Sequence, residues 1–195
     1  VYASTSGIYG KSAFDKSVKE DYIVDPRTSY SVAKRFNEIY LKSLWLERGV
    51  ASSSIRYFNV YGSRQDTRMV IPRFITQAKN NNPIVVYGDG NQTRDFTFVK
   101  DAVRITFDIG KKLKQGSEIY NLCGNNEIPI IEVAHLIKKY LKSQSEIRYL
   151  ESPVSRYEFE VKRRTGNSQK LNTFLGKQSY TPFKKGLLQT IDNYG

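Results

Sequence analysis

The order of patterns between residues 29 and 58 constrains the fold of this chain more than any other feature. From Ser29 to about Arg48, apolar side chains recur at spacings of three and four residues, which is typical of an amphipathic helix. Gly49 follows, where a helix commonly ends, and Ser53 to Phe58 reads as a β-strand. Helix, glycine and strand in this order predict an α/β unit that feeds a parallel sheet.

The same alternation continues along the rest of the chain, with no internal repeat or low-complexity tract. Residues 1–4 read as the end of a strand. Further helices are expected over 70–80, 101–113, 130–141 and 183–194, and further extended segments over 84–87, 96–99, 118–122 and 147–150. The predicted class is therefore α/β.

Composition argues against a membrane protein. The chain has 195 residues, 39% of them hydrophobic and 26% charged, as is usual for globular proteins. Its apolar stretches are far shorter than the roughly 20 residues that cross a bilayer. The sequence opens at Val1, without an initiator Met, and shows no signal-peptide pattern. No membrane partner is expected.

The scarcity of cysteine and histidine limits the possible chemistry. Cys123 is the one cysteine and His135 the one histidine. A single cysteine forms neither an internal disulfide nor a multi-thiolate site, so we expect no metal and a reducing, cytoplasmic setting. A zinc site of several histidines is excluded, and a Ser-His-Asp triad would depend on His135.

The formal net charge of +12 has two interpretations. It is either a general property of a basic chain or an attraction to polyanions such as nucleic acid or diphosphate ligands. The basic runs are short, at residues 111–112, 162–164 and 184–185, and short runs are usually solvated faces. Nucleic acid is not the expected partner.

Tyr30 and Lys34 are the candidate catalytic pair. They are four residues apart on the predicted helix, so both side chains lie on one face. A lysine ammonium beside a phenol favours the phenolate, which a phenol needs to act as a base near neutral pH. Any long helix can contain Tyr-x-x-x-Lys by chance, so the interpretation of this pair as catalytic depends on the segments that flank it.

Two strand ends flank this helix in the sequence. Tyr2-Ala-Ser-Thr-Ser-Gly-Ile-Tyr-Gly10 opens into a hydroxyl-rich turn, and Arg56-Tyr-Phe-Asn-Val-Tyr-Gly62 opens into another turn. Ligands of open α/β sheets bind beyond the carboxyl ends of the strands. The pattern therefore predicts a site where these two ends meet the helix.

With these segments, the sequence resembles the extended short-chain dehydrogenases, specifically the NAD-dependent epimerase/dehydratase branch. Ser-Tyr-Ser-Val-Ala-Lys, Val-Ile-Pro-Arg-Phe-Ile, Tyr-Gly-Asp-Gly-Asn-Gln-Thr-Arg-Asp-Phe and Tyr-Asn-Leu-Cys-Gly also match, in the family's order. The resemblance covers essentially the whole chain. It implies the C-terminal part of a Rossmann-like parallel sheet, at residues 1–66 and about 98–122. A smaller α/β nucleotide-sugar-binding region would comprise about 67–97 and 123–195.

The resemblance also implies NAD as the cofactor, although one family motif is missing. The Gly-x-x-Gly-x-x-Gly turn that cradles the pyrophosphate does not occur in this sequence. By comparison with the family, the first strands are absent. We therefore expect that this chain alone neither binds NAD tightly nor turns over.

The catalytic roles that the resemblance implies fall on three residues. Tyr30 would remove a proton from a sugar hydroxyl, and Lys34 would bind the nicotinamide ribose and lower the pKa of Tyr30. Thr5 would hydrogen-bond the reacting hydroxyl. Its neighbours Ser4 and Ser6 would either assist or cap the turn.

The resemblance assigns further residues to binding. Phe58 would pack near the nicotinamide, and Asn59 would hydrogen-bond the substrate diphosphate. Arg94 would clamp the diphosphate, because a guanidinium fork meets phosphate oxygens bidentately. The strand from Val85 to Tyr87 would line the nucleobase pocket. Arg156 would be a second diphosphate ligand, with Arg163 as its substitute, whereas Asp95, Asp101, Cys123 and His135 are interpreted as structural.

The residues after Thr5 favour one reaction within the family. Dehydratases of the family carry Asp-Glu there and decarboxylases a Glu, whereas this chain has Ser6-Gly7. Without that carboxylate, oxidation and re-reduction remain, which predicts a UDP-sugar 4-epimerase that acts through a 4-keto intermediate. The resemblance also implies a homodimer of the full-length protein. The alternatives are a dehydratase or decarboxylase, a non-catalytic nucleotide-sugar-binding fragment and, after these, a nucleic-acid binder.

Overall fold

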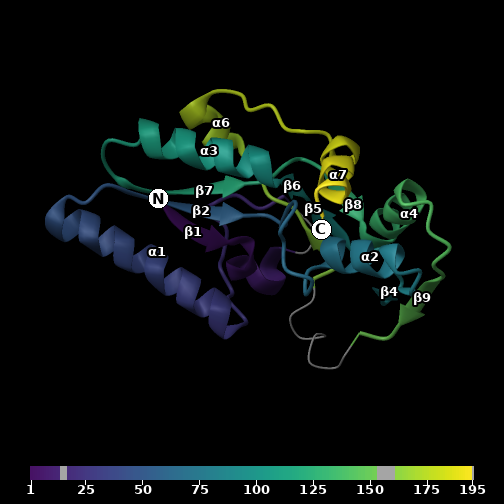
Figure 1. Cartoon of the computed structure of the whole chain (residues 1–195). Coiled ribbons are helices and arrows are strands. Elements are labelled where there is room, and N and C mark those ends of the chain that lie inside the picture. The colour runs from purple at the N-terminus through teal and green to yellow at the C-terminus, as the bar shows by residue number, and fades with distance from the viewer. Residues whose placement is uncertain (14–16, 153–160, 195) are drawn as a thin grey trace.

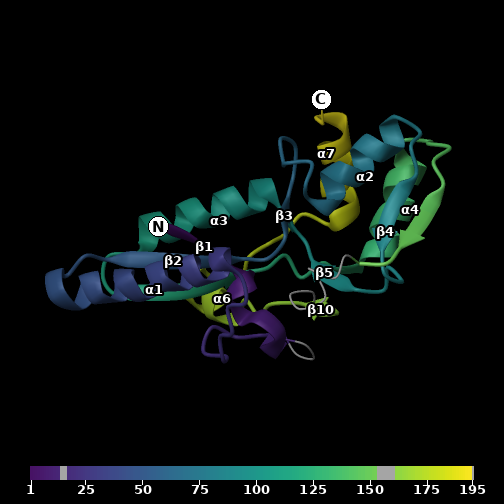
Figure 2. The same ribbon diagram turned by 90° about the horizontal axis from the view of Figure 1, so that it is seen from below.

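The computed structural model describes residues 1–13, 17–152 and 161–194, which form two adjoining α/β regions (Figures 1 and 2). In the first, a parallel sheet of order β1-β2-β7 lies between α1 on one face and α3 on the other (Figure 1). Its elements are β1 (Tyr2–Thr5), η1 (Ser6–Ala13), α1 (Ser29–Arg48), β2 (Ser52–Tyr57), α3 (Val99–Lys112), β7 (Ser117–Leu122) and α6 (Gln169–Leu175). The predicted α/β class is confirmed.

Local signals define both ends of α1. Thr28 is extended, and its Oγ1 accepts the main-chain N–H of Ser31 at 3.1 Å, which satisfies one of the unpaired donors of the first turn. Gly49 ends the helix in the left-handed conformation, with φ of 67°, which a glycine adopts at little cost. The helix predicted over 29–48 is thereby confirmed, and Tyr30 is placed in its first turn.

The register of the sheet brings three strand ends to one edge. Thr5 pairs with Tyr57, which in turn pairs with Leu122, and all three strands are parallel. The carboxyl ends of β1 and β2 are therefore level. The turn after Thr5 and the segment at Asn59 leave the sheet side by side, as the sequence predicted from the two strand ends.

The second region is built around its own apolar core, to the right of the sheet in Figure 1. Its elements are β3 (Val60–Tyr61), α2 (Val70–Lys79), β4 (Ile84–Tyr87), β5 (Thr93–Asp95), β6 (Thr97–Phe98), β8 (Glu127–Pro129), α4 (Ile130–Tyr140), β9 (Ile147–Leu150), β10 (Arg163–Arg164) and α7 (Phe183–Asp192). The parallel pair β4-β9 lies with α2 and α4, and the short sheet β10-β5-β8 lies nearer the first region (Figure 2).

The extended segment expected over 96–99 contains β6. The sequence does not predict the other short strands, β3, β5, β8 and β10, because strands of two or three residues are too short to show a periodicity. The helix α6 was assigned with 123–195 to the second region. The structure instead packs its Leu171 with Ile55 and Ile105 in the core of the first region, because this segment of the chain returns to β7.

In the part of the chain that the structure describes, no helix has the length and apolar character needed to cross a bilayer.

Candidate functional site

A cavity of about 850 Å³ lies at the carboxyl ends of β1 and β2, where the two regions meet. Its lining comes from β1 and the turn after it, from the first turns of α1, from the segment after β2, from α2 and from α3. The lining residues discussed below are Ser4, Thr5, Ser6, Tyr30, Lys34, Asn59, Val103, Phe107 and Arg164. The site predicted at these strand ends is thus a cavity of the structure.

Tyr30 and Lys34 lie on one side of this cavity. Tyr30 is 59% exposed and lies in the first turn of α1. The Lys34 Nζ lies 5.5 Å from the centroid of the Tyr30 ring and 5.0 Å from that of Tyr2. It also donates a hydrogen bond to the main-chain oxygen of Ala3 at 2.7 Å. The ammonium is therefore held between α1 and β1, next to the phenol.

Thr5 ends β1 and lines the same cavity. Its Oγ1 accepts the main-chain N–H of Gly7 at 3.1 Å. An oxygen that accepts in this way still carries its own hydroxyl proton, so Thr5 can donate a hydrogen bond to a ligand. Ser4, the neighbour expected to assist, donates instead to the Glu38 carboxylate at 2.6 Å, and Ser6 lines the cavity.

Asn59 and Phe58 follow β2 but have different surroundings. Asn59 lines the cavity, and its Nδ2 donates to the main-chain oxygen of Asp95 at 3.0 Å. Its φ of 34° is unusual for a residue other than glycine. Phe58 is fully buried and packs with Tyr9 and Cys123, outside the cavity lining.

The binding residues expected in the second region lie outside the cavity lining. Val85 and Tyr87 belong to β4, where the guanidinium of Arg73 lies 5.1 Å from the centroid of the Tyr87 ring. Arg94 on β5 donates from Nη1 to the main-chain oxygens of Thr93 and Val161, at 2.8 and 2.9 Å. The Nη1 atom of this guanidinium is therefore bound to main-chain oxygens.

The second expected diphosphate ligand cannot be placed. Arg156 lies outside the described residues. Its substitute, Arg163, makes two hydrogen bonds to the Glu127 carboxylate, at 2.7 and 2.8 Å. Arg163 is therefore engaged across the short sheet by a partner that the sequence did not suggest.

Arg164 is the cavity residue that sequence reasoning missed. Among the described residues of the lining, the charged side chains are Lys34 and Arg164. Arg164 belongs to the basic run at 162–164, but nothing in that run indicates which of its members faces a cavity. The apolar wall formed by Val103 and Phe107 of α3 was likewise unpredicted, and these two side chains are exposed toward the cavity.

The residues interpreted as structural behave mostly as expected. Asp101 accepts the main-chain N–H of Thr181 at 2.7 Å. Burial raises the pKa of Asp95 to about 6, although the main-chain N–H of Asn126 partly opposes this shift. Burial also raises the pKa of the Cys123 thiol, so this thiol is inert rather than nucleophilic. His135 differs from expectation, because it is exposed on the outer surface of α4.

Comparisons with known proteins show which family the chain resembles. Residues 1–123 match the model of the NAD dependent epimerase/dehydratase family. Human dTDP-D-glucose 4,6-dehydratase is 32% identical across the whole chain, which spans 55% of that protein. UDP-N-acetyl-alpha-D-glucosaminuronate decarboxylase of Bacillus cytotoxicus is 34% identical over 98% of the chain, which spans 62% of that protein.

A solved structure gives the corresponding comparison of folds. UDP-glucuronic acid 4-epimerase from Bacillus cereus, in complex with UDP-glucuronic acid and NAD, has a TM-score of 0.89 with 28% identity. The match covers 98% of this chain and 59% of that one. The prediction of a partial Rossmann-like fold is confirmed, and the chain spans little more than half the length of such relatives. Because the family model matches more than half of its residues, the chain belongs to the NAD dependent epimerase/dehydratase family.

Proposed function

We propose that this chain carries the acid–base and substrate-binding part of an NAD-dependent nucleotide-sugar 4-epimerase. The observation that carries the proposal is the arrangement of Tyr30, Lys34 and Thr5 around one cavity whose described lining contains no carboxylate. A phenol beside an ammonium, facing a hydroxyl donor, is suited to remove a proton from a sugar hydroxyl.

The residues of the cavity fit the nicotinamide end of NAD. Lys34 offers an ammonium with three N–H donors, one of which the Ala3 carbonyl accepts. Tyr30 and the apolar side chains of Val103 and Phe107 offer a surface for a flat ring. The pyrophosphate has no glycine-rich turn to bind in this sequence. We therefore expect the chain alone to bind NAD more weakly than about 1 μM.

The proposed steps use the three side chains in turn. NAD supplies a hydride acceptor that is regenerated in each turnover. Tyr30 takes the proton of the sugar C4 hydroxyl while hydride leaves C4, and Thr5 donates a hydrogen bond to the same oxygen. Lys34 stabilises the phenolate through its charge. The 4-keto sugar then rotates in the site. Tyr30 returns the proton to the C4 oxygen as hydride returns to the other face of C4.

Elimination or decarboxylation within the same family is the second candidate, because a dehydratase and a decarboxylase are among the relatives. Both reactions call for an added acid or base beside the reacting carbons. In this chain Ser6 and Gly7 follow Thr5, and the Cβ of any side chain at position 7 would lie 2.8 Å from the Ser31 Oγ. Position 7 therefore carries no carboxylate and has little room for one, which supports epimerisation over elimination or decarboxylation.

Product identity tests the proposal. A panel of UDP- and dTDP-linked sugars is incubated with NAD and with the chain, both alone and joined to the glycine-rich part of a relative. Mass spectrometry and NMR then identify the products. The joined protein should form an epimer of unchanged mass, whereas the chain alone should form no product; loss of water or carbon dioxide by the joined protein would instead identify the second candidate. Binding without any product in the joined protein would leave a non-catalytic nucleotide-sugar-binding fragment.

We also propose that the protein forms a homodimer through α1. Five large apolar side chains recur at helical spacing on one face of this helix, and they are 51–73% exposed: Val32, Phe36, Ile39, Tyr40 and Leu46. In Figure 1, α1 lies alone on its side of the sheet. Analytical ultracentrifugation of the chain and of Phe36→Lys tests this. A monomer at all concentrations would contradict it.

A further inference from the structure

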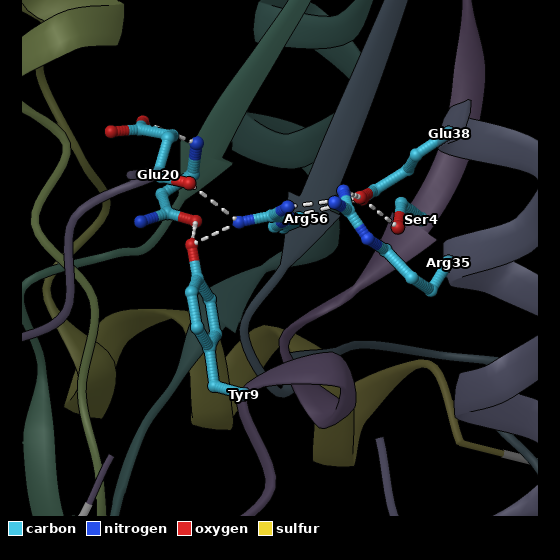
Figure 3. A network of polar contacts seen from close by, with 7 residues as sticks. Ser4, Tyr9, Glu20, Arg35, Glu38 and Arg56 are labelled. Carbon is cyan, nitrogen blue, oxygen red and sulfur yellow. Dashed lines mark hydrogen bonds and ion pairs between the residues drawn. The ribbon is translucent and has the colours of Figure 1, made fainter. Parts of the chain in front are cut away.

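A buried ion pair ties α1 to the sheet beside the cavity (Figure 3). The Arg56 guanidinium on β2 donates from Nε and Nη2 to the two oxygens of the Glu38 carboxylate on α1, at 3.0 and 2.9 Å. At most 1% of either side chain is exposed. Ser4 on β1 donates to the same carboxylate at 2.6 Å. One carboxylate thus joins α1, β1 and β2.

The ion pair lies close to the proposed catalytic groups. Glu38 is four residues after Lys34 and eight after Tyr30, so the three side chains lie along one face of α1. On the other side of the contact, Ser4 immediately precedes Thr5. The carboxylate therefore links the Tyr30–Lys34 face to the strand that ends in Thr5.

Arg56 is itself fixed from the opposite side. Its Nη1 donates to Tyr9 Oη at 2.8 Å and to the main-chain oxygen of Glu20 at 3.0 Å. Tyr9 in turn donates to the Asn121 side chain on β7, at 2.8 Å. A guanidinium held at both ends cannot follow α1 if the helix slides, so it sets the position of Glu38.

The pair is ionised in the fold. Burial by itself would raise the pKa of Glu38, but the hydrogen bonds and charge of Arg56, with the bonds from Ser4 and Arg35, hold it below its usual value. Two buried charges seldom stabilise a fold more than a well-packed apolar pair of the same size. The advantage of this pair therefore lies in the geometry that its bidentate contact imposes.

We propose that Glu38 and Arg56 are positioning residues, which set the height of α1 over the sheet and so hold Tyr30 and Lys34 in register with Thr5. This inference rests on the proposed function, in which those three side chains act on one substrate atom. A displacement of about 1 Å in such an arrangement costs about 100-fold in rate.

The first measurement needs no turnover. Trp45, the single tryptophan of the chain, is half-buried on α1, seven residues after Glu38, and reports the seating of the helix. In Glu38→Leu/Arg56→Met, which removes both charges together, the melting temperature should stay close to the wild-type value. The emission maximum and acrylamide quenching of Trp45 should both shift. Glu38→Asp, which keeps the charge but shortens the reach, should shift them too, with a cooperative melting transition as the check on folding.

The second measurement uses whichever preparation turns over a nucleotide sugar. We expect kcat of the double variant to fall about 10- to 100-fold, with KM changed by less than about threefold, because binding residues are untouched. Glu38→Asp should lose less. Ile137→Val in the core of α4, a substitution remote from the cavity, should lower stability and leave kcat unchanged.

The outcomes separate the inference from the function on which it rests. A folded double variant with wild-type kcat, or with unchanged Trp45 emission, overturns the positioning role. If the wild-type protein turns over no sugar in any preparation, the proposed function fails. Trp45 emission in Glu38→Asp and in the double variant then decides by itself whether the ion pair seats α1.

Discussion

The Lys34 Nζ and the main-chain oxygen of Ala3 lie 2.7 Å apart, so the lysine of the Tyr-x-x-x-Lys pair is bound to β1. β1 is one of the two outer strands of its three-stranded sheet among the described residues. The contact ties Lys34, one turn after Tyr30 on α1, to the strand that ends in Thr5, two residues beyond Ala3. It shows how a helix and a strand that are remote in sequence form one polar surface.

Replacing Tyr30 by phenylalanine should stop turnover while sugar-nucleotide binding persists. The phenol carries the proton in the proposed reaction, whereas the ring surface is kept. We expect kcat to fall by at least about 100-fold. Turnover by product NMR and affinity by calorimetry measure the two effects separately. Full activity in this variant would refute the proposed base.

Replacing Thr5 by valine should lower kcat about 100-fold, whereas Thr5→Ser should retain most of it. Valine has nearly the same shape but lacks the hydroxyl that accepts the Gly7 N–H and donates to the ligand. Steady-state kinetics on both variants test this, with melting temperatures as the check on folding. Equal losses in the two variants would indicate a packing effect instead of a hydrogen bond.

Arg164 and Arg94 should both contribute to binding. Arg164→Met should weaken nucleotide-sugar binding by roughly 10-fold or more, since the side chain lines the cavity. Arg94→Met should weaken binding and also lower the melting temperature, because it removes the bonds to the Thr93 and Val161 carbonyls. Calorimetry and thermal unfolding measure the two quantities. Unchanged affinity in both variants would show that neither Arg164 nor Arg94 binds the diphosphate.

Asp95 should make the protein less stable as the pH rises toward neutrality. Burial raises its pKa to about 6 from the usual 3.8, so the folded state binds the proton more tightly. The stabilisation is fully present below pH 3.8 and is lost as the pH rises through about 6. Relative to Asp95→Asn, the wild-type free energy of unfolding should fall by on the order of 1–3 kcal/mol across this range.

Urea unfolding of both proteins at several pH values measures that difference. Asp89→Asn is a matched control of opposite sign, because the main-chain N–H of Asn91 holds the pKa of the exposed Asp89 below its usual value. A constant difference between wild type and Asp95→Asn from pH 3.8 to 6 would contradict the shift.

Two helical glycines should respond oppositely to alanine. In α7, a Cβ at Gly186 would overlap Tyr61 Oη and lie 3.1 Å from Phe98, so Gly186→Ala should cost about 1–3 kcal/mol of stability. In α3, a Cβ at Gly110 would meet only the side chain of Val1, at 3.2 Å. Gly110→Ala should therefore stabilise by up to about 1 kcal/mol. Chemical denaturation tests both, and the reverse order would contradict the packing of α7 on Tyr61.

The sequence alone determined the elements that carry strong local signals. The helix from Ser29 to Arg48 was predictable because its apolar periodicity and its terminal glycine are local properties. The approach of Thr5 and Asn59 to Tyr30 was also predictable, because parallel strands bring their carboxyl ends to one edge. The family itself was identifiable from motifs that remain in order along the chain.

Only the tertiary structure decided which side chains meet across these elements. The sequence could not show that Arg164 faces the cavity while Arg163 binds Glu127, since neighbours on a short strand point to opposite faces. Nor could it show that Arg56, within a strand motif, is buried against Glu38. Such contacts depend on how a helix is seated on a sheet to within about an ångström, and that seating results from packing over the whole core.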